Sequence, residues 1–137
     1  MKIQNYKFNE KGLNRFFGPL EAKIMNILWN SSELAIKDVQ QKLEKEKKTS
    51  FNTVMTVMNR LVEKEVLTKR MEGRGSLYRP VLTKNDFLER QSKELTNGLI
   101  DEFGQLVVSH MIDSLEEADE SLIAKLEQKI KEMKKEK

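Results

Sequence analysis

The sequence predicts a mainly α-helical protein with one small β-hairpin. Apolar residues recur at spacings of three and four along much of the 137-residue chain, which is the period of an amphipathic helix. Two short runs near the middle, 67–72 and 77–80, have strand character and flank Gly73-Arg74-Gly75-Ser76, whose glycines can take positive φ. We therefore expect a series of helices interrupted once by a hairpin.

The front half of the chain contains three expected helices. The first begins at Pro19, a residue suited to the first helical position, and ends before the polar residues 30–32. The second covers 36–46, and the third covers 51–64 with Ser50 as its N-cap. Two helices, a short turn and a third helix make a helix-turn-helix, and a hairpin after it is the wing of a winged-helix domain.

The third helix has an apolar side and a polar side. At 100° per residue, one arc collects apolar side chains and the opposite side collects short amides and hydroxyls. The arc comprises Phe51, Val54, Val57, Met58, Leu61 and Val62, and the polar side comprises Asn52, Thr56, Asn59 and Glu63, flanked by Thr53 and Arg60.

This polar side suits recognition of DNA bases. Asparagine and arginine make bidentate contacts to purine edges, and a threonine methyl can touch a thymine methyl. A solvated helix surface more often carries Lys and Glu, and a run of Asn and Thr costs helix propensity. We interpret Asn52, Thr53, Thr56, Asn59 and Arg60 as a candidate base-reading face.

The hairpin and the charge distribution favour the same polyanionic partner. Arg74 lies at a glycine-flanked tip, with Lys69, Arg70 and Arg79 nearby, where they can reach phosphates or the minor groove. The basic turn 45–48 is a further phosphate candidate, although a solvated turn explains it equally well. Residues 1–80 carry 16 Lys/Arg against 9 Asp/Glu, and residues 81–137 carry 9 against 13. The front half is therefore +7 and the back half −4.

The back half is expected to pair two copies of the chain. Helical spacing resumes near Asn85, with Gly98 and Gly104 as weak points, so one kinked helix or two are possible before a last amphipathic helix. Two copies related by a two-fold axis would read a palindrome. The expected dimerisation residues are Leu95, Leu99, Phe103, Leu106, Val107, Met111, Leu122 and Leu126.

The composition gives little support for an enzyme. The chain has no cysteine, and its one histidine, His110, is expected to be a core or interface residue rather than a base or ligand. Neither Ser109 nor Ser114 has an evident orienting partner for a nucleophile–base pair. The acidic run 116–120 lacks a metal-loop pattern. We expect no catalytic residue, no metal and no cofactor.

The patterns together divide the chain into three parts. They predict an N-terminal tail over 1–17, from which Phe16 and Phe17 could pack onto the domain, a winged-helix DNA-binding domain over 18–82, and a helical dimerisation domain over 83–137. Without a signal peptide or an apolar run near 20 residues, we expect a cytoplasmic protein with no membrane insertion. The alternative function is a winged-helix module that binds another protein.

Three segments resemble one bacterial family. They are GPLEAKIMNILW (18–29), TSFNTVMTVMNRLVEKEVLTK (49–69) and EGRGSLYRP (72–80), and their order and spacing are similar to those of the penicillinase-repressor family, the BlaI/MecI/CopY group. The resemblance implies a homodimeric repressor that binds a palindromic operator until an inducing signal removes it. It implies base contacts from Asn52, Thr53 and Thr56, and backbone contacts from Ser50, Arg60 and Arg74.

The chain also departs from this family in two places. Copper-responsive members carry paired Cys-x-Cys motifs, which are absent here, so copper sensing of that type is not expected. β-Lactam-responsive members are cut at an Asn-Phe bond, and Ser109-His110 stands at that place. An inducing membrane metalloprotease remains a possible partner, cutting elsewhere.

Overall fold

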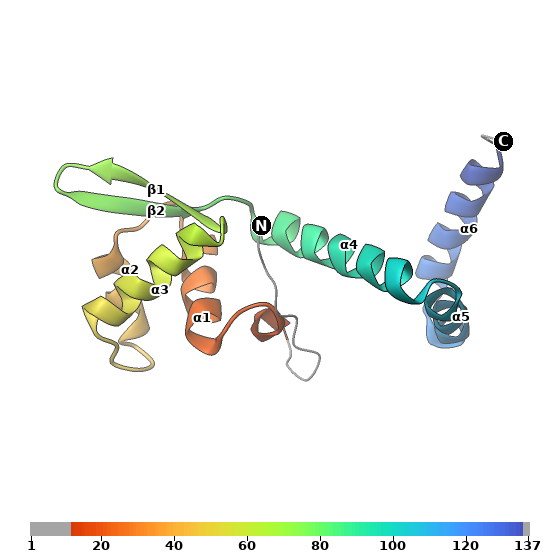
Figure 1. The fold of residues 1–137 in the computed structure, drawn as a ribbon, viewed down its shortest axis with the longest axis horizontal. Helices are drawn as coiled ribbons and strands as arrows, with labels where there is room; N and C mark the ends of the chain where they lie inside the picture. The colour runs from red at the N-terminus through yellow and green to blue at the C-terminus, as the bar shows by residue number, and fades with distance from the viewer. Residues whose placement is uncertain (1–11, 136–137) are drawn as a thin grey trace. The chain divides into compact units, whose positions relative to one another are not determined.

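The computed structural model describes residues 12–135, which divide into two compact units between Leu88 and Glu89. The first unit opens with a 3-10 turn at Gly12–Arg15 and continues into three helices and a hairpin (Figure 1). Its elements are α1 (Pro19–Trp29), α2 (Ile36–Leu43), α3 (Phe51–Glu63), β1 (Leu67–Glu72) and β2 (Gly75–Pro80). The predicted mainly α fold with one hairpin is confirmed. The second helix ends three residues earlier than expected, and the second strand begins two residues earlier.

Side-chain and backbone caps define where the helices of this unit begin. The Ser50 hydroxyl accepts a hydrogen bond from the Thr53 backbone N–H at 3.2 Å, as its predicted N-cap role requires. The Gly18 N–H donates to Glu21 Oε1, and the Ala35 N–H donates to Asp38 Oδ2, each at 3.0 Å. These bonds satisfy backbone groups that a helix start would otherwise leave without a partner.

The end of α3 turns the chain into the hairpin through an unusual residue. Glu65 has φ 64°, a left-handed conformation in which glycine is the common residue. The Val66 N–H then donates to the Leu61 carbonyl at 3.0 Å, which closes the helix end. Because no glycine stands at this position, the sequence gives no warning of this turn.

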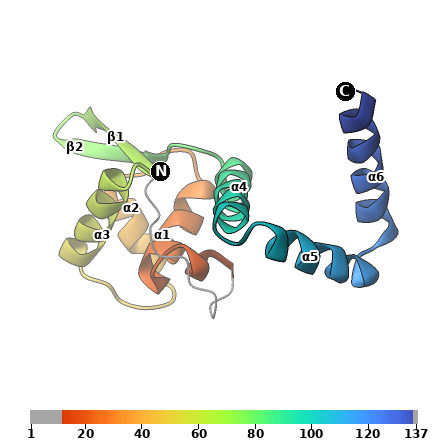
Figure 2. The same ribbon diagram turned by 45° about the vertical axis from the view of Figure 1, so that its right-hand side comes forward.

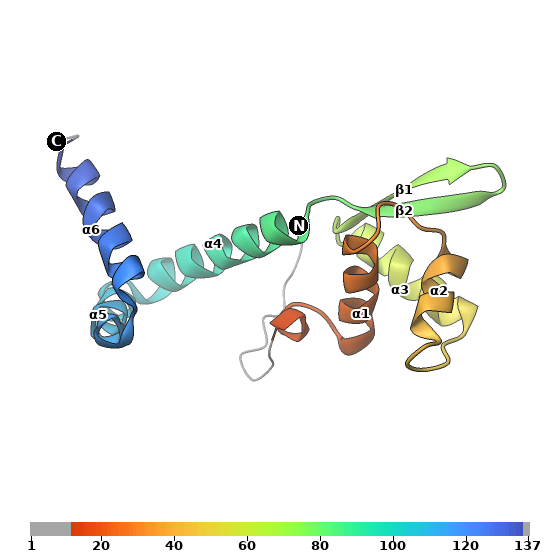
Figure 3. The same cartoon turned by 180° about the vertical axis from the view of Figure 1, so that it is seen from behind.

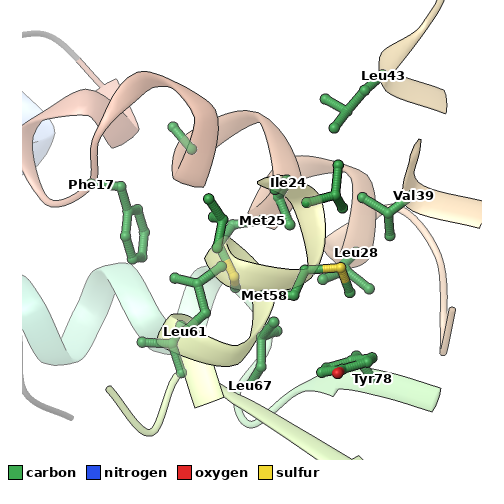
Figure 4. Close-up of a cluster of buried hydrophobic side chains, with 14 of the residues drawn as sticks. Phe17, Ile24, Met25, Leu28, Val39, Leu43, Met58, Leu61, Leu67 and Tyr78 are labelled. Carbon is green, nitrogen blue, oxygen red and sulfur yellow. The ribbon is translucent and has the colours of Figure 1, made fainter. Parts of the chain in front are cut away.

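The core of the first unit lies where the three helices meet the hairpin. Figure 4 shows side chains from α1, α2, α3 and both strands gathered in one cluster. Phe51 is an exception to the predicted apolar arc, because its side chain is 44% exposed at the first position of α3. The buried members of the arc are Val54, Val57, Met58 and Leu61.

The hairpin is a regular antiparallel ladder extended by one residue of the α1–α2 connection. Leu67 pairs with Pro80 at one end and Glu72 with Gly75 at the other. Leu34 forms a bridge with Tyr78 through two backbone hydrogen bonds of 2.8 and 3.0 Å. The far end of the hairpin projects past the helices, as Figure 3 shows from behind.

Aromatic packing brings the start of the next helix, α4 (Lys84–Phe103), into the first core. Phe87 is fully buried and stacks on Phe17 with ring centroids 5.3 Å apart. Phe16 meets the same ring edge-on at 5.8 Å, and Trp29 lies 5.3 Å away. The expected packing of Phe16 and Phe17 is therefore observed. The rest of the predicted tail, residues 1–11, lies outside the described residues.

The second unit consists of the remainder of α4 followed by α5 (Gln105–Ser114), a 3-10 turn (Leu115–Glu117) and α6 (Glu120–Lys135), drawn in Figure 2. Gly104, with φ 53°, separates α4 from α5, whereas Gly98 remains inside α4. Of the two glycines that the sequence offered as weak points, the one with positive φ is the break.

We predict that Phe87→Ala destabilises the first unit by about 3–5 kcal/mol, because it leaves a cavity among packed rings. The free energy of unfolding can be followed in urea by the fluorescence of the neighbouring Trp29. Glu89→Ala, an exposed change on the same helix, should stay within about 0.5 kcal/mol of the wild type. Equal values for the two variants would contradict the assigned role of Phe87.

Candidate nucleic-acid interface

The candidate interface begins with the side of α3 that the core leaves in solvent. Since Val54, Met58 and Leu61 are buried, the opposite side of the helix must face outward. Asn52, Thr53, Thr56 and Arg60 are all exposed, as predicted. The structure therefore brings these four proposed DNA contacts onto one accessible surface.

The two threonines on this surface have ordered hydroxyls. Thr53 Oγ1 lies 2.8 Å from the Ser50 hydroxyl, beside the helix cap. Thr56 Oγ1 donates to the Asn52 carbonyl at 2.8 Å, one turn earlier. Because each hydroxyl hydrogen bond fixes the rotamer of its threonine, the methyl groups on this face are held in defined positions.

Three polar side chains of the interface have no partner within residues 12–135. They are the amide of Asn52, the guanidinium of Arg60 and the guanidinium of Arg74, which lies between Gly73 and Gly75 at the hairpin tip. All three are exposed, so their donors are available to an external ligand.

Two other cations of the first unit, Lys64 and Arg70, already have internal partners. Lys64 Nζ forms a 2.9 Å ion pair with Glu21, whose carboxylate also accepts from the Gly18 N–H. Arg70, which the sequence suggested as a phosphate contact, makes a bidentate pair with Glu33 at 2.8 and 2.9 Å and a further bond with Glu72. The guanidinium of Arg70 therefore braces the hairpin against the α1–α2 connection.

Asn59 occupies a different position from its neighbours on the predicted polar side. It is only partly exposed, and its Oδ1 accepts hydrogen bonds from the Tyr78 hydroxyl at 2.9 Å and from Lys69 Nζ at 3.3 Å. This hydrogen bond could not be predicted from local periodicity, because Tyr78 lies 19 residues away on β2.

The connection between α2 and α3 presents the predicted basic turn. Lys45, Lys47 and Lys48 are exposed. Gln40 Nε2 donates to the Thr49 carbonyl at 3.0 Å and so anchors the end of this turn beside the start of α3.

The second unit exposes most of the residues predicted for dimerisation. Leu106 is the most exposed of them at 63%, while Leu95, Leu99 and Val107 are partly buried. An open apolar groove lies along α5 and α6 and includes Met111, Leu122 and Leu126. Further exposed apolar residues, not among those predicted, are Ile100, Val108, Ile112, Ile130 and Met133.

The described residues offer little for other chemistries. His110 is exposed on α5, so of the two expected positions, core or interface, the single chain excludes only the core. Within residues 12–135, no group of three His, Asp or Glu side chains is arranged to hold a metal ion. In the same range, no helix has the length and apolarity required to cross a bilayer.

Three packed helices, a hairpin and a bridge to the hairpin from the α1–α2 connection define a winged helix-turn-helix protein, a class typical of DNA binding. A family model described as "Penicillinase repressor" matches residues 17–132. The chain belongs to the penicillinase repressor family, as its three sequence motifs indicated.

Individual relatives agree with this assignment. A "Penicillinase repressor" of Bacillus licheniformis is 30% identical over 77 residues, which cover 56% of this chain and 60% of the relative. A "Transcriptional regulator BlaI" of Mycobacterium tuberculosis is 27% identical over 105 residues, which cover 76% of this chain and 62% of the relative. The chain thus spans about three fifths of the length of these relatives.

Among solved structures, the DNA binding domain of the repressor BlaI is similar to this chain. It is 27% identical, the match covers 56% of this chain and 93% of that domain, and the TM-score is 0.47. A second solved structure is the Bacillus licheniformis BlaI monomeric form in complex with the blaP half-operator. It is 28% identical, the match covers 51% of this chain and 85% of that protein, and the TM-score is 0.44.

We predict that the stabilising effect of Glu33 depends on pH. Hydrogen bonding from Arg70 lowers the pKa of Glu33 below its ordinary value. The ion pair should therefore contribute fully above about pH 5 and be lost as the pH falls through the lowered pKa. In urea denaturation, the wild type should exceed Glu33→Gln in stability near about pH 7 and match it once the Glu33 carboxylate is protonated. A difference that persists at the acid end would contradict this role.

Proposed function

We propose that this protein is a DNA-binding transcriptional repressor that reads a double-stranded operator with α3 and the hairpin. The observation that carries the proposal is that some polar side chains of the first unit have internal partners and others remain available to a ligand. Asn52, Arg60 and Arg74 are exposed and have no side-chain partner in the described part of the chain, whereas Lys64 and Arg70 form ion pairs. This arrangement leaves donors free where a duplex would lie.

The base-reading role belongs to the first turns of α3. The N-terminal residues of a recognition helix reach the base edges of the major groove. Asn52 supplies an amide suited to adenine, and the ordered Thr53 and Thr56 supply methyl groups and hydroxyl oxygens. Glu63, exposed near the far end of α3, would repel phosphate, so the contact fades before it.

Backbone contacts would come from Ser50, Arg60, Lys69 and Arg74. Ser50 lies at the helix N-terminus, where the helix dipole favours a phosphate. Arg60 and Lys69 flank the reading surface, and Arg74 at the hairpin tip can reach the adjacent backbone or minor groove. These contacts fix the register of the protein on DNA without themselves reading sequence.

The second unit would pair two copies of the chain. Its exposed leucines, isoleucines and methionines line an open apolar groove along α5 and α6, and grooves of this kind mark interaction sites. A two-fold dimer would place two copies of α3 on half-sites about 34–36 Å apart, or a multiple of that, and so match a palindromic operator. The predicted division at residues 82 and 83 into DNA-binding and dimerisation domains belongs to this proposal.

Repression would end when an inducing signal removes the dimer from DNA. We propose no catalytic step and no cofactor for this chain, and a cytoplasmic location where the operator is accessible. An inducing membrane metalloprotease is the partner that the family resemblance suggests.

A selection experiment tests the proposal against a protein-binding module. The full chain is incubated with random-sequence duplexes of about 30 base pairs, long enough for two half-sites, and bound duplexes are amplified and sequenced. Enrichment of a palindrome supports the repressor. Weak retention without sequence enrichment would instead indicate a protein-binding module. If the dimer contacts about 6–10 phosphates, log K should fall against log salt with a slope of roughly −5 to −9.

We predict that Asn52→Ala weakens binding to the selected duplex by about 1–3 kcal/mol and leaves binding to random DNA almost unchanged, since the lost amide contacts a base. Fluorescence anisotropy on both duplexes measures the difference. Arg74→Ala is the matched comparison. It should weaken both duplexes similarly and flatten the salt slope by about 1. Equal losses for Asn52→Ala on both duplexes would remove it from the base contacts.

We predict that Leu126→Glu in the full chain shifts the protein from dimer to monomer. It places a charge on an exposed apolar face whose burial is worth about 1.5–3 kcal/mol per leucine. Sedimentation equilibrium measures the association constant. Lys131→Glu, which changes charge on the same helix outside the apolar groove, should retain the dimer. Unaltered association of Leu126→Glu would show that α6 does not form the interface.

A further inference from the structure

Asn59 connects α3, the helix proposed to read bases, to the hairpin proposed to contact the DNA backbone. Its Oδ1 accepts from two residues on different strands, Tyr78 on β2 and Lys69 on β1. Both lone pairs of the amide oxygen are therefore engaged inside the protein. Asn59 lies on the predicted reading side of α3, but its acceptor atom points to the hairpin rather than to solvent.

Tyr78 provides a rigid support for this connection. Its side chain is only 2% exposed, its backbone bridges to Leu34, and its ring lies in the core shown in Figure 4. Burial raises the pKa of the Tyr78 hydroxyl, so the group stays protonated at neutral pH and remains a donor. The hydrogen bond to Asn59 thus ties α3 to a strand that cannot easily move.

Lys69 is positioned by the same pair of residues. Its ammonium lies 3.3 Å from Asn59 Oδ1 and 6.0 Å from the centroid of the Tyr78 ring, at the outer limit of a cation–π contact. A lysine side chain in solvent samples many rotamers. Here two neighbours restrict it beside α3, although the residue remains exposed.

We propose that Asn59 is a positioning residue that couples α3 to the hairpin, so that Lys69 and the base-reading side chains meet DNA as one preformed surface. This inference rests on the proposed function. Its physical basis is that a surface fixed before binding loses less conformational entropy on binding. Asn59 would act through Tyr78 and Lys69, and not through a base.

A double-mutant cycle on the full chain tests the coupling. Asn59→Ala removes the shared acceptor, and Tyr78→Phe removes one donor while keeping the ring. On the duplex selected by the wild type, each single change should weaken binding about two- to tenfold, the range of one net hydrogen bond. Tyr78→Phe should add less than about twofold when Asn59 is already alanine, because the two changes remove the same link.

The salt dependence provides a readout that simple destabilisation does not change. Asn59→Ala should flatten the plot of log K against log salt by about 1, since Lys69 is no longer held at its phosphate. Trp29→Phe is the matched control. It removes another tertiary hydrogen bond of the unit, the 2.9 Å bond to the Leu82 carbonyl, and should lower the melting temperature without altering affinity or slope.

Three other outcomes would contradict the inference, and each has a different meaning. If the losses of the two single variants multiply in the double variant, Asn59 and Tyr78 act independently. If Tyr78→Phe binds like the wild type and Asn59→Ala loses affinity only for the selected duplex, Asn59 reads a base directly. If the wild type selects no duplex, the proposed function fails first and the inference fails with it.

Discussion

The burial of one side of α3 is the constraint on which the candidate interface depends. Val54, Met58 and Leu61 are sealed in the core, so rotating the helix by even one residue position would expose them and bury amides or hydroxyls without partners. Both changes are costly, and together they fix which residues face outward. The positions of Asn52 and Thr56 in solvent are thus a consequence of packing on the opposite side, and substitutions on the exposed face leave that packing intact.

Internal ion pairs then sort the basic residues of the first unit into two groups. Lys64 forms an ion pair with Glu21. Arg70 forms ion pairs with Glu33 and Glu72. These two cations therefore stabilise the arrangement of the helices and the hairpin. Cations such as Arg74, which has no partner among residues 12–135, contribute their whole charge to the field outside the protein. The 16 Lys/Arg of residues 1–80 therefore overstate how many cations remain for the proposed DNA contact, because internal carboxylates neutralise some of them.

Much of this organisation could be predicted because it depends on local periodicity. Helical spacing located α3 and its two sides, and two short runs located the hairpin. Predictions were wrong or absent where distant residues decide the outcome. Phe51 fits the apolar arc, yet 44% of it remains exposed at the first position of α3. Phe87 and Leu88 are flanked by polar residues, and the burial of Phe87 depends on Phe17 and Trp29, 70 and 58 positions away. The hydrogen bond between Asn59 and Tyr78 was not predicted, because Tyr78 is remote in sequence.

The chemistry of the two units would let one short chain combine the proposed DNA recognition with the proposed self-association. A surface that reads bases must keep its polar groups hydrated until DNA replaces the water, so it cannot also bury them against a second copy. Self-association needs the opposite, an apolar surface whose removal from water is favourable. The sequence separates these demands along its length. The proposed DNA contacts Asn52, Thr56 and Arg74 lie before residue 81, and the exposed Phe103, Leu106 and Leu126 lie after it. The net charge of −4 over residues 81–137 reinforces the separation, because an acidic unit is repelled by phosphate and leaves the basic unit as the favoured side for DNA.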